Sequence, residues 1–199
     1  MATKKIGKGT LAIVVAIIIL AIYAISSYNS MVTQDEAVRT AWSDVQTQYQ
    51  RRSDLIPNLV STVRGYASHE STTLEQVVAA RSRATQLTAD VDQLTPEKLQ
   101  QLEVAQGELS AALGRLLAIT ENYPDLKANQ NFSELQAQLE GTENRIAESR
   151  RLYNETVRAY NTGIRRLPRN LMAGLFGFDV RPPFQADAAA QQAPTVSFD

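Results

Sequence analysis

The chain has 199 residues, a formal net charge of −1 and no cysteine. This length allows one domain plus a membrane anchor. Without cysteine the chain has no disulfide, zinc–thiolate site, iron–sulfur cluster, thiol nucleophile or lipoprotein anchor. The lysines at positions 4, 5 and 8 precede the first acidic residue, Asp35, and the remainder carries 17 basic and 21 acidic residues. A body of net charge −4 repels phosphate polymers, so we expect no nucleic-acid partner.

The first predicted element is a membrane anchor. An unbroken apolar run extends from Leu11 to Ile25. With its uncharged flanks it predicts a transmembrane helix over residues 9–28, because about 20 apolar residues cross the hydrocarbon core of a bilayer. A cleaved signal peptide is the alternative, since Ala24 and Ser26 are small enough for a cleavage site. The many β-branched residues and the helical pattern that follows favour an uncleaved anchor.

The charges that flank the anchor predict its orientation. Residues 1–8 form a basic flank with three lysines, whereas Arg39 is the first basic residue on the other side. Because basic flanks stay in the cytoplasm, we expect a cytoplasmic N-terminus and a body outside the bacterial cytoplasmic (inner) membrane.

A long helix continues from the anchor into the body, which spans residues 29–167. Apolar residues recur from Val38 to Tyr66 at alternating spacings of three and four, which is typical of a helix packed along other helices in a coiled coil. Arg52 occupies one of these apolar positions. We expect it to lie buried beside an acid or at an opening in the bundle. Pro57 predicts a break or kink, because proline has no backbone N–H.

Three more helices are predicted in the body. Residues 69–87 form a short amphipathic helix. The string Thr95-Pro96-Glu97 combines a capping hydroxyl, a proline at the first helical position and an acid, which predicts the start of a third helix that ends at Pro124. The most regular pattern runs from Phe132 to Leu167 and predicts a fourth helix. Short connections make neighbours antiparallel, so the expected fold is all-α, with a single transmembrane helix followed by a long antiparallel four-helix bundle.

In this topology the fourth helix ends near the bilayer. We expect residues 168–184 to form an apolar, membrane-proximal segment, which either contacts lipid headgroups or a neighbouring subunit, or folds back and caps the bundle. The side chains predicted to contact the membrane are Leu171, Met172, Leu175, Phe176, Phe178, Arg165, Arg166 and Arg169. Residues 185–199 are rich in Ala, Gln and Pro and are predicted to be a flexible tail.

Several strings resemble the LemA family of bacterial membrane proteins. They are Tyr28-Asn29 with Glu36 and Ala41-Trp42, then residues 51–60, 65–70 and 123–145, the pairs Tyr153-Asn154 and Tyr160-Asn161, and residues 171–178. The resemblance implies an N-terminal membrane anchor and a long helical bundle, and it implies no known reaction. Some members carry a cysteine before the Tyr-Asn pair, where this chain has Ser27. Others are described with a cytoplasmic bundle, so the opposite orientation stays open.

The polar residues suggest interaction surfaces and no catalytic apparatus. The candidate interaction residues are Arg51, Arg52, Asp54, Pro57, Tyr123, Asp125 and Lys127. His69 is the only histidine, and without cysteines it lacks partners for an ordinary zinc site, so we expect a turn residue. Gly141 lies inside a predicted helix, which suggests the close approach of another helix. Phosphate-loop, nucleophile-elbow and metalloprotease motifs are absent, so we expect no catalytic, cofactor or metal site.

These patterns predict a membrane-anchored, non-enzymatic interaction or scaffold protein of the bacterial cell envelope that assembles with copies of itself. The alternative is an accessory or adaptor subunit of a membrane protease or an envelope-stress signalling system, with residues 123–145 as the docking surface. A third possibility is an enzyme that uses His69 and carboxylates. The expected partners are the lipid bilayer, other copies of the chain and an envelope protein.

Overall fold

The computed structural model describes residues 8–87 and 89–185. Residues 1–7 of the predicted basic flank and residues 186–199 of the predicted tail lie outside this part. The helices are α1 (Lys8–Tyr66), α2 (Ser71–Gln86), η1 (Val91–Gln93, a 3-10 turn), α3 (Pro96–Thr120), α4 (Pro124–Lys127), α5 (Gln130–Arg165) and α6 (Arg169–Phe176). The described residues contain no strand, which confirms the prediction of an all-α fold.

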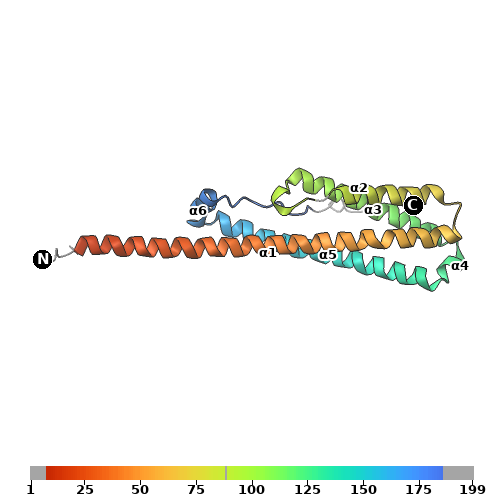
Figure 1. Cartoon of the computed structure of the whole chain (residues 1–199), viewed down its shortest axis with the longest axis horizontal. Helices are drawn as coiled ribbons and strands as arrows, with labels where there is room; N and C mark the ends of the chain where they lie inside the picture. The colour runs from red at the N-terminus through yellow and green to blue at the C-terminus, as the bar shows by residue number, and fades with distance from the viewer. Residues whose placement is uncertain (1–7, 88, 186–199) are drawn as a thin grey trace, which may run out of the picture.

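The long helices pack in two antiparallel pairs. α1 lies beside α5, and α2 and α3 form a hairpin that contacts the distal part of α1. Figure 1 shows that the N-terminal part of α1 projects alone beyond these neighbours. The chain therefore leads away along α1, returns along α2, leads away again along α3 and returns along α5, so that α6 lies back near the projecting part of α1.

The apolar core has two clusters along the length of the body. The cluster nearer the projecting end contains Trp42, Tyr153 and Phe184, and the distal cluster contains Ile56 and Phe132. The predicted apolar stripes supply most of both clusters. Two predicted positions are exceptions: Leu167 lies beyond the end of α5 and is 78% exposed, and Tyr66 at the end of α1 is 44% exposed.

α1 passes through Pro57 without the predicted break. A proline has no N–H for the carbonyl four residues earlier, which here belongs to Ser53. The side chain of Arg81, on α2, donates from Nε to that carbonyl oxygen at 2.8 Å. A neighbouring helix therefore supplies the hydrogen bond that Pro57 cannot make, and α1 continues to Tyr66.

The helix starts follow their capping residues. The Thr95 hydroxyl accepts a hydrogen bond from the Lys98 N–H at 3.2 Å and caps α3 as predicted. α3 ends at Thr120, before the predicted stop, because Pro124 begins the separate short helix α4. Proline suits a first helical position, since the N–H that it lacks has no helical partner there. Asn129 caps α5 by accepting a hydrogen bond from the Phe132 N–H at 3.0 Å.

The close approach predicted at Gly141 is wrong. A Cβ atom built there meets nothing within 4 Å, and the same is true of Gly114. The glycine of α5 that faces a neighbour is Gly163, where a Cβ would overlap the side-chain amide of Gln34 on α1. The sequence does not distinguish Gly141 from Gly163, because both lie inside the same helix. Only the packing of α1 against α5 shows that Gly163 faces a neighbour.

Candidate membrane interface

The N-terminal part of α1 is a candidate membrane span. Its apolar window has a mean hydropathy of 2.6, and none of that window is buried by the described protein. The segment from Gly9 to Tyr28 rises about 30 Å at 1.5 Å per residue, which matches the thickness of the hydrocarbon core. The large side chains of this segment are exposed, Ile19 and Leu20 to 61% and 66%. An exposed apolar surface of this kind marks a membrane or protein interaction site.

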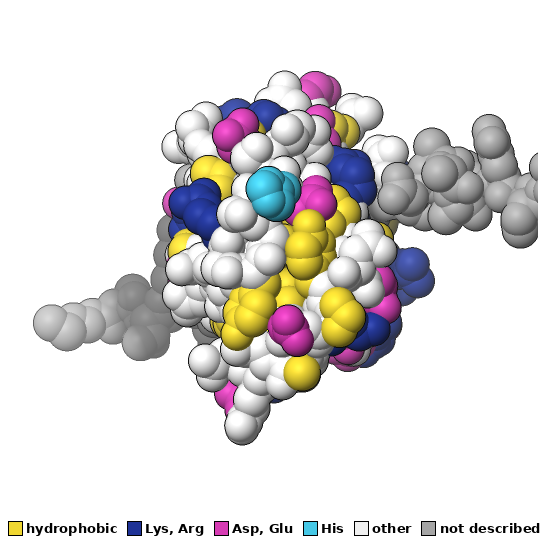
Figure 2. Space-filling view, turned by 90° about the vertical axis from the view of Figure 1, so that its right-hand side faces the viewer, with side chains coloured by type: hydrophobic (Ala, Val, Ile, Leu, Met, Phe, Trp, Pro, Cys, Tyr) yellow, Lys and Arg dark blue, Asp and Glu magenta, His cyan; other side chains and the backbone are white. Residues whose placement is uncertain are grey.

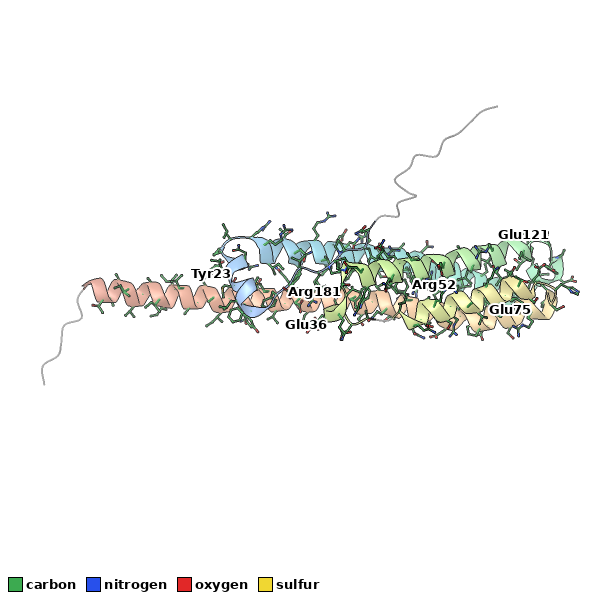
Figure 3. The ribbon with its side chains drawn as sticks, turned by 90° about the horizontal axis from the view of Figure 1, so that it is seen from above. Tyr23, Glu36, Arg52, Glu75, Glu121 and Arg181 are labelled. Atoms are coloured by element: carbon green, nitrogen blue, oxygen red, sulfur yellow. The ribbon has the colours of Figure 1, made fainter. Side chains whose placement is uncertain are left out.

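α6 packs against α1 at the end of this apolar segment. The ring of Tyr28 meets Phe176 and Phe178 edge to face, with ring centroids 5.0 and 5.7 Å apart. Ala173 of α6 is buried in the proximal core cluster. Figure 3 shows α6 against α1 between the labelled Tyr23 and Glu36. Part of the predicted membrane-proximal segment therefore folds back onto α1, immediately beside the residues that leave the apolar segment.

The opposite side of α6 carries an exposed apolar stripe. Leu171 and Leu175, four residues apart on α6, are 71% and 78% exposed, and Leu167, which precedes the helix, is also exposed. Residues four apart lie on one face of a helix. Met172 and Phe178 are half-buried against the proximal core cluster instead. The residues predicted for membrane contact thus divide between a face that covers α1 and a face that is open.

Arginines surround this stripe at the end of α5. Arg165 and Arg166 are exposed, and neither has an ion-pair or hydrogen-bond partner for its side chain in the described part of the chain. Arg169 begins α6 and donates from Nη2 to the Ser30 hydroxyl at 3.0 Å, which ties α6 to α1. The three predicted arginines therefore lie at the same end as the apolar stripe, and two of them are available to an anionic partner.

Residues 179–185 follow α6 and lie along α5 in an extended strap. Asn161 exchanges two hydrogen bonds with the backbone of Arg181, at 2.8 and 2.9 Å, and Asn154 does the same with Phe184, at 3.1 and 2.8 Å. The two asparagines are seven residues apart and share one face of α5. The repeated Tyr-Asn pair is the sequence signal for this strap. The predicted segment 168–184 consequently has two parts, and only the first stays near the apolar end of α1.

The aromatic end of the strap completes the proximal core. Phe184 is 6% exposed, with its ring centroid 5.4 Å from that of Tyr153 and 6.0 Å from that of Trp42. The Arg150 guanidinium lies 4.4 Å from the Phe184 ring centroid, close enough for a cation–π contact. The Tyr153 hydroxyl donates to the Pro182 carbonyl at 3.0 Å, and burial raises the pKa of Tyr153 to about 12.

An ion cluster fixes the middle of the strap. Arg181 donates to the carboxylates of Asp35 at 2.9 Å and Asp92 at 2.8 Å, and Arg39 bonds the same two acids at 3.0 and 2.7 Å. The hydrogen bond from Arg39 lowers the pKa of Asp92, and the bond from Arg181 acts in the same direction. Sequence reasoning missed Arg181, because its partners come from α1 and η1 and no spacing in the sequence relates them.

Arg52 forms a buried polar layer between the two core clusters. Its side chain is 2% exposed and pairs with Glu143 on α5 at 2.5 Å. It also donates to Ser110 at 2.8 Å and to the side-chain carbonyl of Gln106, both on α3. Of the two arrangements expected for this residue, burial beside an acid is the one present. Arg52 (labelled in Figure 3) is therefore part of the interior and not of a surface.

The other residues of that group lie on the surface of α1. Arg51, Asp54 and Pro57 are exposed, and Asp54 accepts a hydrogen bond from Gln50 at 2.7 Å. The four residues predicted as one interaction group thus face two directions, with Arg52 directed into the core.

The distal end is built from the turns around α4. The Tyr123 hydroxyl donates to Glu70 at 3.0 Å, which raises the pKa of Tyr123, and Lys127 pairs with Glu121 at 2.5 Å. Asp125 is exposed. Of the three predicted interaction residues here, Tyr123 and Lys127 already make internal contacts, and Asp125 is open.

The histidine also lies at this distal surface, between α1 and α2. His69 is exposed, and Figure 2 shows the histidine beside an acidic side chain and a group of hydrophobic side chains. Within residues 8–87 and 89–185, no group of three or more histidines and carboxylates could hold a metal ion. The geometry around the histidine is that of a surface turn.

Comparison with known proteins agrees with the helical architecture. The sequence profile of the LemA family matches residues 41–198. The chain belongs to the LemA family. This LemA-family chain is 27% identical over 197 residues to the magnetosome protein MamQ of Magnetospirillum gryphiswaldense, covering 88% of this chain and 72% of that protein. It is 27% identical over 208 residues to magnetosome protein MamQ 2 of Paramagnetospirillum magneticum, covering 94% of this chain and 76% of the relative.

A further relative carries the family name itself. Protein LemA of Metamycoplasma hominis is 25% identical over 145 residues, which cover 73% of this chain and 63% of that protein. The region matched by the LemA profile contains the strap and α6 together with the long helices, and it begins after the apolar segment of α1.

Proposed function

We propose that this LemA-family chain is a membrane-anchored, non-enzymatic scaffold of the bacterial cell envelope. The observation that carries the proposal is the continuity of α1, whose exposed apolar part leads without a break into the helix that organises both core clusters. In this proposal the four long helices act as one antiparallel bundle held upright on the bilayer. The N-terminus lies in the cytoplasm and the bundle lies outside the cytoplasmic membrane, because the lysines precede the span.

α6 is the element that would contact the membrane surface. Its open stripe, Leu171 and Leu175, lies on the same short helix that packs on Tyr28, at the level where the apolar segment ends. An amphipathic helix with this exposure lies in the interface between headgroups and acyl chains. The neighbouring arginines would then face lipid phosphates, which favours an upright body.

Because the natural sequence has no cysteine, single-cysteine spin labels test this contact directly. A label at Leu175, on α6, is compared with a label at Val104, which is 57% exposed on α3. In vesicles we expect the label at 175 to collide preferentially with oxygen, which concentrates in lipid, and the label at 104 with a water-soluble nickel complex. Equal accessibility profiles at the two positions would contradict the interfacial placement of α6.

Self-assembly is the second part of the proposed function. Before its contacts with α6, the apolar segment of α1 is not buried by the described residues, so lipid or another copy must cover it. Two relatives are named magnetosome proteins, which supports a role in a cellular structure. Mass photometry of the full chain in mild detergent should show species larger than one copy. A strictly monomeric protein at every concentration would exclude self-assembly.

Topology has its own test. Protease added to intact spheroplasts should digest the bundle and leave a cytoplasmic marker protein intact. Protection of the bundle until the membrane is permeabilised would place it in the cytoplasm and contradict the proposed orientation.

An adaptor role for the distal end is the second candidate function. Tyr66 is 44% exposed there, and Figure 2 shows hydrophobic side chains gathered on this end of the body. A docking partner would be an envelope protein with a complementary apolar surface. A photo-crosslinking residue at position 66 should then capture one dominant heterologous protein from native membranes, whereas the same residue at Gly141, exposed on the side of α5, should not. Crosslinks between copies of the chain at position 66 would favour the scaffold function instead.

A further inference from the structure

A groove at the membrane-side end is formed by α1, α5 and the start of α6. Its volume is about 640 Å³. The floor lies where Gly163 of α5 faces Gln34 of α1, and the groove extends along α1 as far as Tyr23, which belongs to the apolar segment. One end of the groove therefore lies against the soluble body, and the other reaches the part of α1 that enters the bilayer.

The groove is strongly basic. Arg158, Arg166 and Arg169 all line it. Arg158 and Arg166 are exposed and have no ion-pair or hydrogen-bond partner for their side chains among the described residues, while Arg169 is held toward α1 by Ser30. The one carboxylate in the lining, Glu155, pairs with Arg151 at 2.5 Å. The unpaired charge of the groove is thus positive, although the body as a whole is acidic.

The apolar part of the lining lies at its other end. Leu167 is 78% exposed and lines the groove together with Tyr23. Tyrosine near the end of a transmembrane segment is typical of the headgroup region. An occupant that matches this lining carries a negative group for the arginines and an apolar chain for the tyrosine and leucine.

We propose that this groove binds an anionic phospholipid, with its phosphate between Arg166 and Arg169 and its acyl chains along Tyr23. The inference rests on the membrane insertion of α1 that the proposed function also requires. The antiparallel pairing sets Gly163 at the level of Gln34, so Arg166 lies about 5 Å nearer the bilayer along α5. This places Arg166 and Arg169 just above the apolar segment, where phosphates lie. Arg158, about 12 Å above Arg166 by the same rise, extends the positive field away from the membrane.

The net charge of the lipid decides between headgroups. A zwitterionic lipid brings a cation of its own beside the phosphate, and the arginines would repel that cation. A lipid such as phosphatidylglycerol offers the phosphate alone. A soluble phosphate would reach the arginines and would miss the contacts with Leu167 and Tyr23.

Native mass spectrometry of the full chain in nonionic detergent measures this preference. The ligands are phosphatidylglycerol, phosphatidylcholine with the same acyl chains, and soluble glycerol phosphate. We expect phosphatidylglycerol to be retained at least fivefold more tightly than either of the others. Equal retention of phosphatidylcholine, or equal binding of glycerol phosphate, would overturn the proposal of an anionic-lipid site.

A double variant and a charge-matched control test the residues. Arg158→Gln with Arg166→Gln should weaken the binding of phosphatidylglycerol about fivefold, since an arginine near a lipid surface contributes about fivefold and Arg158 lies more than a Debye length of about 8–10 Å above Arg166. Arg64→Gln with Arg145→Gln removes the same charge from exposed positions outside the groove and should change binding less than twofold. Equal losses in the two double variants would reduce the effect to net charge and overturn the site. Unchanged thermal unfolding shows that both variants stay folded.

The outcomes separate this inference from the proposed function. If the chain assembles in membranes and shows no preference for phosphatidylglycerol, the lipid site is refuted and the scaffold function stands. If the chain is water-soluble without detergent, both the lipid site and the membrane-anchored scaffold are refuted.

Discussion

The hydrogen bond that spans the proline of α1 gives the sharpest prediction. Arg81 donates to the Ser53 carbonyl at 2.8 Å, and Pro57 is the residue that cannot do so. Hydrogen bonds from a charged donor contribute about 1.5–3 kcal/mol. Because Arg81 is half-buried, we expect Arg81→Met to lower the free energy of unfolding by about 1.5 kcal/mol, near the lower end of that range. Methionine keeps most of the packing of the arginine stem.

The same substitution should cost little when position 57 has an N–H. In Pro57→Ala, the new backbone N–H donates to the Ser53 carbonyl within the helix. That carbonyl then no longer depends on Arg81 for a hydrogen bond. We expect Arg81→Met to cost less than about 0.5 kcal/mol in that background, a coupling of about 1 kcal/mol between the two positions. Urea unfolding of the full chain in nonionic detergent, monitored by circular dichroism, measures this coupling. It is carried out on the natural chain, the two single variants and the double variant.

A neighbouring arginine on the same helix is the control. Arg83 is exposed and pairs with Glu108 on α3 at 3.0 Å, so Arg83→Met should cost well under about 1 kcal/mol and should not depend on residue 57. If Arg81→Met has the same cost with proline and with alanine at position 57, the carbonyl of Ser53 does not need its side-chain donor and the reasoning fails.

Three further predictions concern the core and α5. Phe184→Ala should cost up to about 3 kcal/mol and shift the fluorescence of Trp42, the only tryptophan, to the red; an unchanged spectrum contradicts the packing of the strap. Gly141→Ala should stabilise by about 1 kcal/mol in urea unfolding, because its Cβ meets no atom within 4 Å, whereas Gly163→Ala should gain less. The pKa of Tyr153 is raised to about 12, so its contribution is full below the ordinary pKa of about 10 and is lost as pH rises toward 12. Tyr153→Phe should flatten that alkaline decline in stability measured at several pH values.

The helices and the candidate anchor could be predicted because their signals are local. The apolar run of α1, the Thr95-Pro96 start of α3 and the regular spacing of α5 each lie within one segment, where periodicity and capping act over a few residues. Arg52 is an intermediate case. The break in the apolar pattern identified it as unusual, and its partners Gln106 and Glu143 became known only when α3 and α5 were placed beside α1.

The interface depended on contacts between segments far apart in the sequence. Pro57 predicted a break or kink, and α1 is not broken there because an arginine 28 residues from Ser53 supplies the missing donor. Arg181 joins Asp35 across 146 residues, and no local pattern encodes such a pair. By itself the sequence determined which segments are helical and which of them is apolar enough to enter a membrane, since these properties depend on neighbours along the chain. Only the tertiary structure decided that the C-terminal segment divides into an open helix and a buried strap, because that division depends on which faces of α1 and α5 remain uncovered after the helices pack.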